Sequence, residues 1–340
     1  MQYVTIGTTE MQGSVIALGT WAAGGWMWGG TEEKEAVAAI RTALEHGVNL
    51  IDTAPVYGFG RSEEIVAKAL EGFPREKVLI ATKCGLAWTK EEWPKGKGIL
   101  HFYTTEKGEG SADHFDYRVY KYLRPESIRK EVEESLRRLQ TDYIDLLQTH
   151  WQDETSCVAE TMETMMKLKE EGKIRAVGIS NTTCATLEEY EKVGRVEVIQ
   201  ERYSLLDREI EENGLLEKAK KEQITLLPYS PLCRGLLTGR MAPERVFGEG
   251  DRRSHEPRFS PESRRQVNEK LAQLQPLAEK HGLTQAQLVI AWTFSKYPKT
   301  NVLCGSRTPH QVLENVAAGD ARLSTEEIAE IESVFAAVRI

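Results

Sequence analysis

Short apolar segments rich in β-branched residues alternate with longer amphipathic segments along most of the chain. This alternation is typical of βα units on a parallel sheet, because such strands are buried on both faces and each leads into a helix with one apolar face. The segments predicted to be strands are Val15–Leu18, Asn49–Asp52, Val78–Thr82, Tyr143–Thr149, Ile174–Ser180, Val196–Gln200, Thr225–Tyr229 and Asn301–Leu303. The clearest predicted helices are Thr31–His46, Pro125–Leu139, Val158–Glu170 and Pro309–Ala317.

Residues typical of helix ends support several of these boundaries. Thr31 is expected to open its helix, and Pro125 suits a first helical turn, where no backbone N–H is needed. Gly47 and Gly172 are expected just past two helix ends, where the left-handed conformation favours glycine.

Two segments fall outside the eight repeated units. Residues Tyr3–Ile6, separated from the first strand by Gly13, are predicted to form an N-terminal β-hairpin that covers the lower mouth of the fold. Residues Ser324–Val338 have the pattern of an extra C-terminal helix. Because no linker or low-complexity segment interrupts the chain, residues 1–340 are predicted to form one domain.

Eight strands that each lead into a helix fit either a closed barrel or an open doubly wound sheet. A nucleotide-binding open sheet normally carries a GxGxxG or GxxxxGK turn after a strand, and no predicted strand here is followed by one. The predicted fold is therefore α/β, a (β/α)8 TIM barrel. A length of 340 residues is usual for such a barrel.

Four ionisable residues follow neighbouring predicted strands. The second strand ends on Asp52, the third runs into Lys83 and the fourth into His150, while Tyr57 lies in the loop after Asp52. Because active sites of (β/α)8 barrels lie at the carboxyl ends of the strands, these side chains are expected to converge.

Their combined chemistry suits the reduction of a carbonyl group. Hydride arriving at a carbonyl carbon leaves an alkoxide that needs a proton, and Tyr57 can supply it if its pKa is lowered. A nearby lysine cation, Lys83, stabilises the phenolate, and Asp52 keeps that lysine in place. His150 can orient the carbonyl oxygen or assist the proton transfer.

Each of these residues alone also has a structural explanation. Asp52 could cap a helix, and Lys83 could be a solvated charge. Tyr57 could be a turn aromatic, and His150 a hydrogen-bonded structural group. Only their combination indicates catalysis.

Charge, apolar runs and cysteine spacing argue against nucleic acid, membrane and metal as partners. The formal net charge is −8, so no broad basic face for nucleic acid is predicted. The N-terminus lacks the pattern of a signal peptide, and no apolar run is long enough to cross a bilayer. The five cysteines include no CxxC pair, which argues against a zinc site or a disulfide framework. No metal is predicted, and a reducing, cytoplasmic location is expected.

The remaining acidic residues have simple structural interpretations. The solvent-facing sides of two helices are predicted to carry Glu131, Glu133, Glu134, Glu209, Glu211 and Glu212. Asp145, inside the fourth strand, is predicted to be a partnered structural group.

Four segments resemble the aldo-keto reductase family, in the right order and over nearly the whole chain. GVNLIDTAPVYGFGRSEE resembles the family's signature around its catalytic Asp and Tyr, and VLIATKCG the strand that carries its Lys. DLLQTHW resembles the strand that carries its His, and KIRAVGISN the strand whose Ser-Asn pair holds the nicotinamide carboxamide. The resemblance implies that Tyr57 is the general acid/base, that Lys83 paired with Asp52 lowers its pKa, and that His150 binds the carbonyl.

The resemblance also implies a set of cofactor-binding residues. Ser180, Asn181 and Gln200 would hydrogen-bond the nicotinamide amide, and Tyr229 would stack on its ring. SPLCRGLLTG resembles the loop along the pyrophosphate, and GSRTPHQVLEN the adenosine end. The further residues implied to contact the cofactor are Thr20, Trp21, Ser230, Leu232, Arg234, Gly235, Gly305, Ser306, Arg307, Gln311 and Asn315.

The choice between NADP and NAD depends on the residues at the adenosine end. A 2′-phosphate is best bound by a guanidinium or ammonium group, and Arg307 is well placed for that. Some family branches carry a Lys-Ser pair where this chain has Gly305-Ser306, and an Arg where it has Gln311. The predicted 2′-phosphate site therefore has one obvious cation, Arg307, where those branches have two. NADP is the favoured cofactor, and NAD is the alternative.

Six of the seven tryptophans fall in segments predicted to lie above the barrel. They could simply anchor exposed loops, or they could wall an aromatic carbonyl pocket. The predicted pocket residues are Trp21, Trp28, Trp88 and Trp151.

Two connections are too long to be plain loops. Ala87–Arg124 is predicted either to hold a small hairpin beside the site or to be partly disordered. Leu232–Ser260 is rich in arginine and is either a solvated surface or a flap over the pyrophosphate, with Arg234 as the best phosphate contact.

Three functions are compatible with these features. The leading hypothesis is NADPH-dependent reduction of aldehydes or ketones, with a small carbonyl compound as the partner. A nucleotide-binding regulatory subunit of the same fold, like those of some ion channels, and a barrel enzyme that forms a Schiff base on Lys83 are the alternatives. Neither the physiological substrate nor the oligomeric state follows from the sequence.

Overall fold

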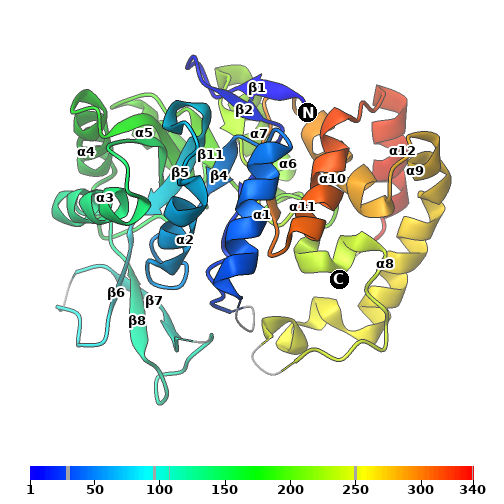
Figure 1. The fold of residues 1–340 in the computed structure, drawn as a ribbon, viewed down its shortest axis with the longest axis horizontal. Coiled ribbons are helices and arrows are strands. Elements are labelled where there is room, and N and C mark those ends of the chain that lie inside the picture. Colours follow the sequence, from blue (N-terminus) through cyan, green and yellow to red (C-terminus); the bar gives the residue numbers. More distant parts are fainter. Residues whose placement is uncertain (28–30, 95–96, 107, 249–250, 339) are drawn as a thin grey trace.

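The computed structural model describes residues 1–27, 31–94, 97–106, 108–248, 251–338 and 340. Its main sheet contains eight parallel strands in the order β12-β11-β10-β9-β5-β4-β3-β13 (Figure 1). Their bounds are β3 Ile16–Gly19, β4 Leu50–Asp52, β5 Leu79–Cys84, β9 Ile144–Thr149, β10 Ile174–Ser180, β11 Val198–Gln200, β12 Thr225–Leu226 and β13 Val302–Gly305. Each predicted strand is therefore confirmed, with boundaries that differ by at most three residues.

The two edge strands of this sheet join, so the sheet closes on itself. Leu226 of β12 forms a parallel bridge with Thr300, and the Leu303 N–H donates to the Pro228 carbonyl at 3.0 Å. The predicted (β/α)8 barrel is thus confirmed, and the open doubly wound sheet is excluded.

Helices cover the outside of the barrel and pack on it through a continuous apolar core. The helices are α1 Glu33–Glu45, α2 Arg61–Leu70, α3 Pro125–Leu139, α4 Val158–Glu170, α5 Cys184–Glu191, α6 Glu209–Glu212, α7 Leu215–Glu222, α8 Pro261–Gln273, α9 Gln275–Lys280, α10 Gln285–Ser295, α11 Pro309–Val316 and α12 Thr325–Phe335. Short 3₁₀ helices lie at η1 Arg75–Lys77, η2 Cys233–Thr238, η3 Arg252–His255, η4 Pro257–Phe259 and η5 Ala317–Asp320. The extra C-terminal helix is confirmed as α12, and none of the helices in the described residues has the length and apolar character needed to span a bilayer.

Most of the predicted helix ends are confirmed, and one is wrong. Pro125 occupies the first turn of α3, and Gly47 and Gly172 follow their helices with φ of +86° and +76°. Thr31 does not cap α1, which begins after Glu32. Its hydroxyl instead donates to the Ala22 carbonyl at 2.7 Å, which ties the segment before α1 to the loop that follows β3.

The N-terminal hairpin closes the lower end of the barrel, as predicted. Strands β1 (Tyr3–Thr5) and β2 (Gln12–Ser14) pair antiparallel at the top of Figure 1. Ile6 and Met11 from the hairpin join the apolar residues inside the barrel, which include Leu50 and Leu146. Burial of these side chains keeps water out of the barrel floor.

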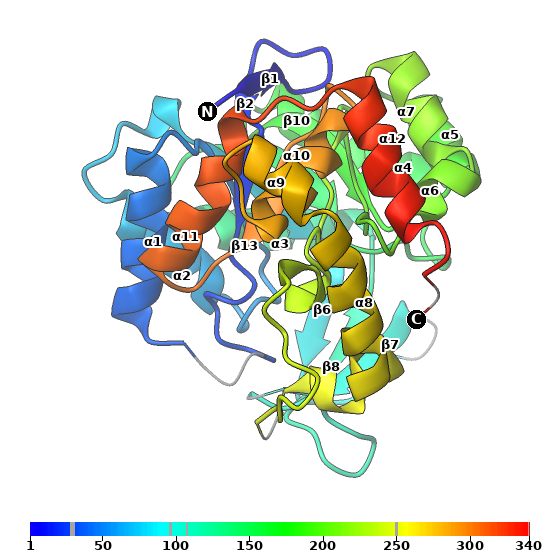
Figure 2. The same ribbon diagram turned by 90° about the vertical axis from the view of Figure 1, so that its right-hand side faces the viewer.

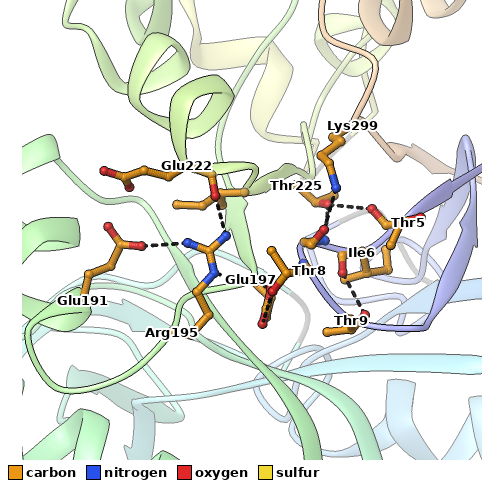
Figure 3. Close-up of polar contacts among 12 residues, drawn as sticks. Thr5, Ile6, Thr8, Thr9, Glu191, Arg195, Glu197, Glu222, Thr225 and Lys299 are labelled. Carbon is orange, nitrogen blue, oxygen red and sulfur yellow. Dashed lines mark hydrogen bonds and ion pairs between the residues drawn. The ribbon is translucent and has the colours of Figure 1, made fainter.

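Polar contacts fix the hairpin to the strand ends beneath it (Figure 3). The buried Glu197 carboxylate accepts from the Thr8 N–H at 2.7 Å, and Thr225 Oγ1 accepts from the Gly7 N–H at 2.7 Å. Lys299 Nζ donates to the Gly7 carbonyl at 2.5 Å. Gly7 has φ of +51°, and a Cβ there would lie 2.1 Å from the Glu197 carboxylate, so this turn requires glycine.

We expect Glu197→Ala to lower the free energy of unfolding by about 1–3 kcal/mol, because the Thr8 N–H would lose its acceptor in a partly buried hydrogen bond. Urea denaturation followed by circular dichroism measures this change. Glu163→Ala, at an exposed position of α4, is the matched control and should shift stability by less than about 0.5 kcal/mol. Equal stability of the two variants would show that the hairpin contact contributes nothing.

The two long connections lie at the other end of the barrel (Figures 1 and 2). The first contains a three-stranded antiparallel sheet in the order β6-β8-β7, which we call the insertion sheet. Its strands are β6 Leu86–Thr89, β7 Ile99–Thr104 and β8 Tyr117–Lys121, so the predicted hairpin is confirmed as part of a larger sheet. The second connection carries η2, η3 and η4.

One acidic residue departs from its predicted exposure. Glu131 is buried, and its carboxylate accepts from the Gly85 N–H at 2.9 Å and from the Ser127 hydroxyl at 2.8 Å. Burial raises its pKa to about 7. The reason is that Gly85 turns the chain from β5 into the insertion sheet, and its N–H needs an acceptor there. Asp145 is paired as predicted, with Arg75 and Arg175.

Candidate active site

The structure brings the four predicted catalytic residues together at the upper end of the barrel. Asp52 ends β4, Lys83 lies on β5, and His150 directly follows β9. Lys83 Nζ donates to Asp52 Oδ2 at 2.7 Å and to the Thr53 carbonyl at 2.8 Å, and both charged side chains are buried. The ring of Tyr57 lies 4.9 Å from Lys83 Nζ and 5.6 Å from the ring of His150.

A tight turn holds Tyr57 over this ion pair. Gly58, Phe59 and Gly60 all have positive φ, and the Gly60 N–H donates to the Pro55 carbonyl at 2.7 Å. A Cβ at Gly58 would lie 2.9 Å from the Gly24 carbonyl oxygen, so the loop from β3 requires glycine here. The turn reverses the chain within a few residues and leaves the Tyr57 ring facing Lys83 and His150.

The electrostatics favour a protonated tyrosine and a neutral histidine. Burial raises the pKa of Tyr57 well above its usual value, and the charge of Asp52 adds to this. Burial and the Lys83 charge hold the pKa of His150 well below its usual value. The expected lowering of the Tyr57 pKa by Lys83 is outweighed, because burial and then the Asp52 charge both raise this pKa. A neutral phenol is the form that donates a proton.

Two glutamines complete the surroundings of Asp52. Gln200 Nε2 donates to Asp52 Oδ1 at 2.8 Å, and Gln148 Nε2 donates to the same oxygen at 3.2 Å. Gln200 was expected at the nicotinamide amide, and here its amide nitrogen faces the carboxylate. Sequence reasoning missed Gln148. Gln148 and His150 are two positions apart, so in a strand their side chains point to the same face. This spacing was the signal in the sequence that could have identified Gln148.

The residues expected around the nicotinamide form one polar network at the ends of β10 and β12. Asn181 Nδ2 donates to the His150 carbonyl at 2.8 Å, and Tyr229 Oη donates to Asn181 Oδ1 at 2.8 Å. Ser180 Oγ donates to the Gln200 carbonyl at 2.7 Å. Asn181 thus links the cofactor side of the site directly to the backbone of His150.

The loop after β12 contains several residues with left-handed backbone. Ser230 and Arg234 have φ of +57° and +53°, and Gly235 has φ of +95°. The Gly235 N–H donates to the Leu232 carbonyl at 2.9 Å, which closes one turn of this loop. Arg234 pairs with Glu256 and lies 5.2 Å over the ring of Phe259, so a phosphate contact from Arg234 would have to share this ion pair.

The residues expected at the adenosine end lie between the end of β13 and the last turn of α11. Gly305 ends β13, and the buried Ser306 hydroxyl accepts from Asn315 Nδ2 at 3.0 Å. Gln311 Oε1 accepts from the Arg307 N–H at 2.9 Å. Gln311 and Asn315 therefore brace the loop that carries Arg307.

Thr20 and Trp21 lie at the upper end of the barrel, beside Asp52 and Tyr57. Thr20 is buried and donates to the Asp52 carbonyl at 2.9 Å. The ring of Trp21 stacks on Tyr57 with centroids 6.1 Å apart. Trp88 and Trp151 belong to the same apolar cluster above the barrel. Trp28 lies outside the described residues.

The donor set of these strand ends fits a nicotinamide dinucleotide. Carboxamide side chains and an aromatic ring, from Asn181, Gln200 and Tyr229, match the amide and ring of nicotinamide. Arg307 and the N-terminus of α11 supply the positive potential that a phosphate needs.

Comparisons with known proteins agree with this arrangement. The model of the Aldo/keto reductase family matches residues 15–336. An NADH-specific methylglyoxal reductase of Escherichia coli K12 is 40% identical over 329 residues, covering 95% of each chain. The aldo-keto reductase YhdN of Bacillus subtilis strain 168 is 38% identical over 337 residues, covering 98% of this chain and 94% of that protein.

A solved structure is similar over nearly the same length. The glycerol dehydrogenase AKR11B4 from Gluconobacter oxydans superimposes with a TM-score of 0.85 and 37% identity, covering 98% of this chain and 95% of that chain. The closed barrel and its upper site define an oxidoreductase that acts on carbonyl compounds with a nicotinamide cofactor. The chain belongs to the aldo/keto reductase family.

Proposed function

We propose that this protein reduces short aldehydes and ketones to alcohols with NADPH, and that Tyr57 is the proton donor. The observation that carries the proposal is the ring of Tyr57 held beside a buried Lys83–Asp52 ion pair and His150. Burial raises the pKa of Tyr57 and lowers that of His150, which favours the protonated phenol and the neutral imidazole. Bound nicotinamide would supply the hydride. We also propose that residues 1–340 act as one domain in the cytoplasm, in keeping with the free cysteines of the described residues.

The roles of the side chains follow from their positions. Tyr57 and His150 both face the space where the carbonyl oxygen would lie, so Tyr57 donates the proton and neutral His150 donates a hydrogen bond. The nearby Lys83 cation stabilises negative charge that develops on the phenol oxygen. Asp52 keeps Lys83 charged in a buried place, where burial alone lowers the lysine pKa. The same ion pair disfavours a Schiff base on Lys83, which needs a neutral amine.

The proposal is tested by following the absorbance of NADPH with purified protein. The panel contains methylglyoxal, glycolaldehyde, propionaldehyde and an aromatic aldehyde, with NADH run in parallel. Oxidation of the cofactor that depends on the aldehyde is the expected result. Tight binding of NADPH without turnover of any aldehyde would instead favour the nucleotide-binding regulatory subunit.

The preference for NADPH is proposed from Arg307, whose guanidinium suits a 2′-phosphate. We expect Arg307→Ala to raise the KM for NADPH by about 10-fold or more, because one charge-assisted contact is lost. The KM for NADH should change by less than about twofold. Arg322→Ala, at an exposed arginine beyond α11, is the control. An equal effect on both cofactors would contradict a role of Arg307 in choosing between them.

A further inference from the structure

His101 lies in the insertion sheet, at an irregularity of strand β7. The partners of β7 on β8 shift between Leu100, opposite Tyr120, and Phe102, opposite Val119. His101 is therefore the extra residue of a β-bulge. Bulges redirect the side chain of the extra residue and are frequent next to active sites.

The redirected imidazole packs on Trp151, next to the predicted catalytic His150. Its ring centroid lies 4.8 Å from that of Trp151, the residue that follows His150. The neighbouring Phe102 stacks on Trp26 at 5.9 Å and holds this part of β7 against the aromatic cluster above the barrel. When protonated, His101 is also one of the groups that lower the pKa of His150, so the two imidazoles lie near each other.

The chemical state of His101 suits the recognition of a polar group. Burial and the nearby Lys121 lower its pKa to about 4, so the ring is neutral at neutral pH. A neutral imidazole offers one donor and one acceptor. Within the described part of the chain, neither ring nitrogen has a hydrogen-bond partner. The ring is therefore held in place by aromatic contacts while its polar atoms stay available.

We propose that His101 is a substrate-positioning residue that hydrogen-bonds a second oxygen next to the reacting carbonyl, and so favours 2-oxoaldehydes and 2-hydroxyaldehydes. This inference rests on the proposed carbonyl reduction. Tyr57 and His150 hold the reacting oxygen, and His101 adds a polar group on the Trp151 side of the same space. A substrate with one carbonyl on an alkyl chain would leave this imidazole without a partner, and a site built for a hydrogen bond discriminates against such a substrate.

The test uses pairs of aldehydes in which a methyl or methylene group replaces the second oxygen function. The pairs are methylglyoxal with isobutyraldehyde, and glycolaldehyde with propionaldehyde. We expect His101→Phe to lower kcat/KM for the oxygenated member of each pair by about 10-fold, mainly through KM, and to leave the alkyl member within about twofold. His101→Gln, which keeps a donor and an acceptor, should recover part of the loss.

The thermal unfolding midpoint and the fluorescence titration with NADPH should be the same for the wild type and both variants. An equal loss for both members of each pair would show a merely structural role and overturn the inference. The inference would also fail if the wild type did not prefer the oxygenated members. No turnover of any aldehyde by the wild type would instead reject the proposed reduction itself, so the two failures are distinguishable.

Discussion

Replacement of Tyr57 by Phe is expected to lower kcat for aldehyde reduction by about 10²–10⁴-fold, the usual contribution of a positioned general acid. The ring would keep its contacts with Trp21 and Lys83, so the KM for the cofactor and the unfolding midpoint should stay nearly unchanged. The measurement is single-turnover oxidation of NADPH with saturating aldehyde.

Tyr143→Phe is the matched control, because Tyr143 lies at the lower end of β9 with Arg75 over its ring, and phenylalanine keeps that contact. It should retain wild-type activity. Full activity of the Tyr57 variant would show that another group donates the proton, with His150 as the next candidate.

Replacement of Asp52 by Asn is expected to lower the free energy of unfolding by about 3–5 kcal/mol, because it leaves Lys83 buried without its counter-charge. The pKa of Lys83 would fall further, since burial lowers it and Asp52 opposes this shift. Activity should also drop, because a neutral lysine no longer stabilises charge on Tyr57. Urea denaturation and the aldehyde assay measure the two effects.

The double variant Asp52→Asn with Lys83→Met separates the two effects. Removing the unpaired charge should recover much of the lost stability, because a buried pair can be replaced by neutral groups at little cost. Activity should stay lost in the double variant. A stability change below about 1 kcal/mol in the single variant would contradict the importance of this ion pair for folding.

The sequence alone determined the barrel and the polar residues at its strand ends. Buried parallel strands are short, apolar and rich in β-branched residues, so their number and order can be read without a structure. Asp52, Lys83 and His150 could be placed because barrel topology sends every strand end to the same face. Tyr57 followed from the segment around Asp52.

Only the tertiary structure decided the contacts that join segments distant in the chain. Gln148 was recognised through its hydrogen bond to Asp52, and His101 through a bulge that depends on pairing with β8. The direction of the Tyr57 pKa shift also required the structure, because it reflects burial and the nearby charge of Asp52. Periodicity reports which face of an element is buried. Burial depth, charge compensation and strand register depend on neighbours that the local sequence does not specify.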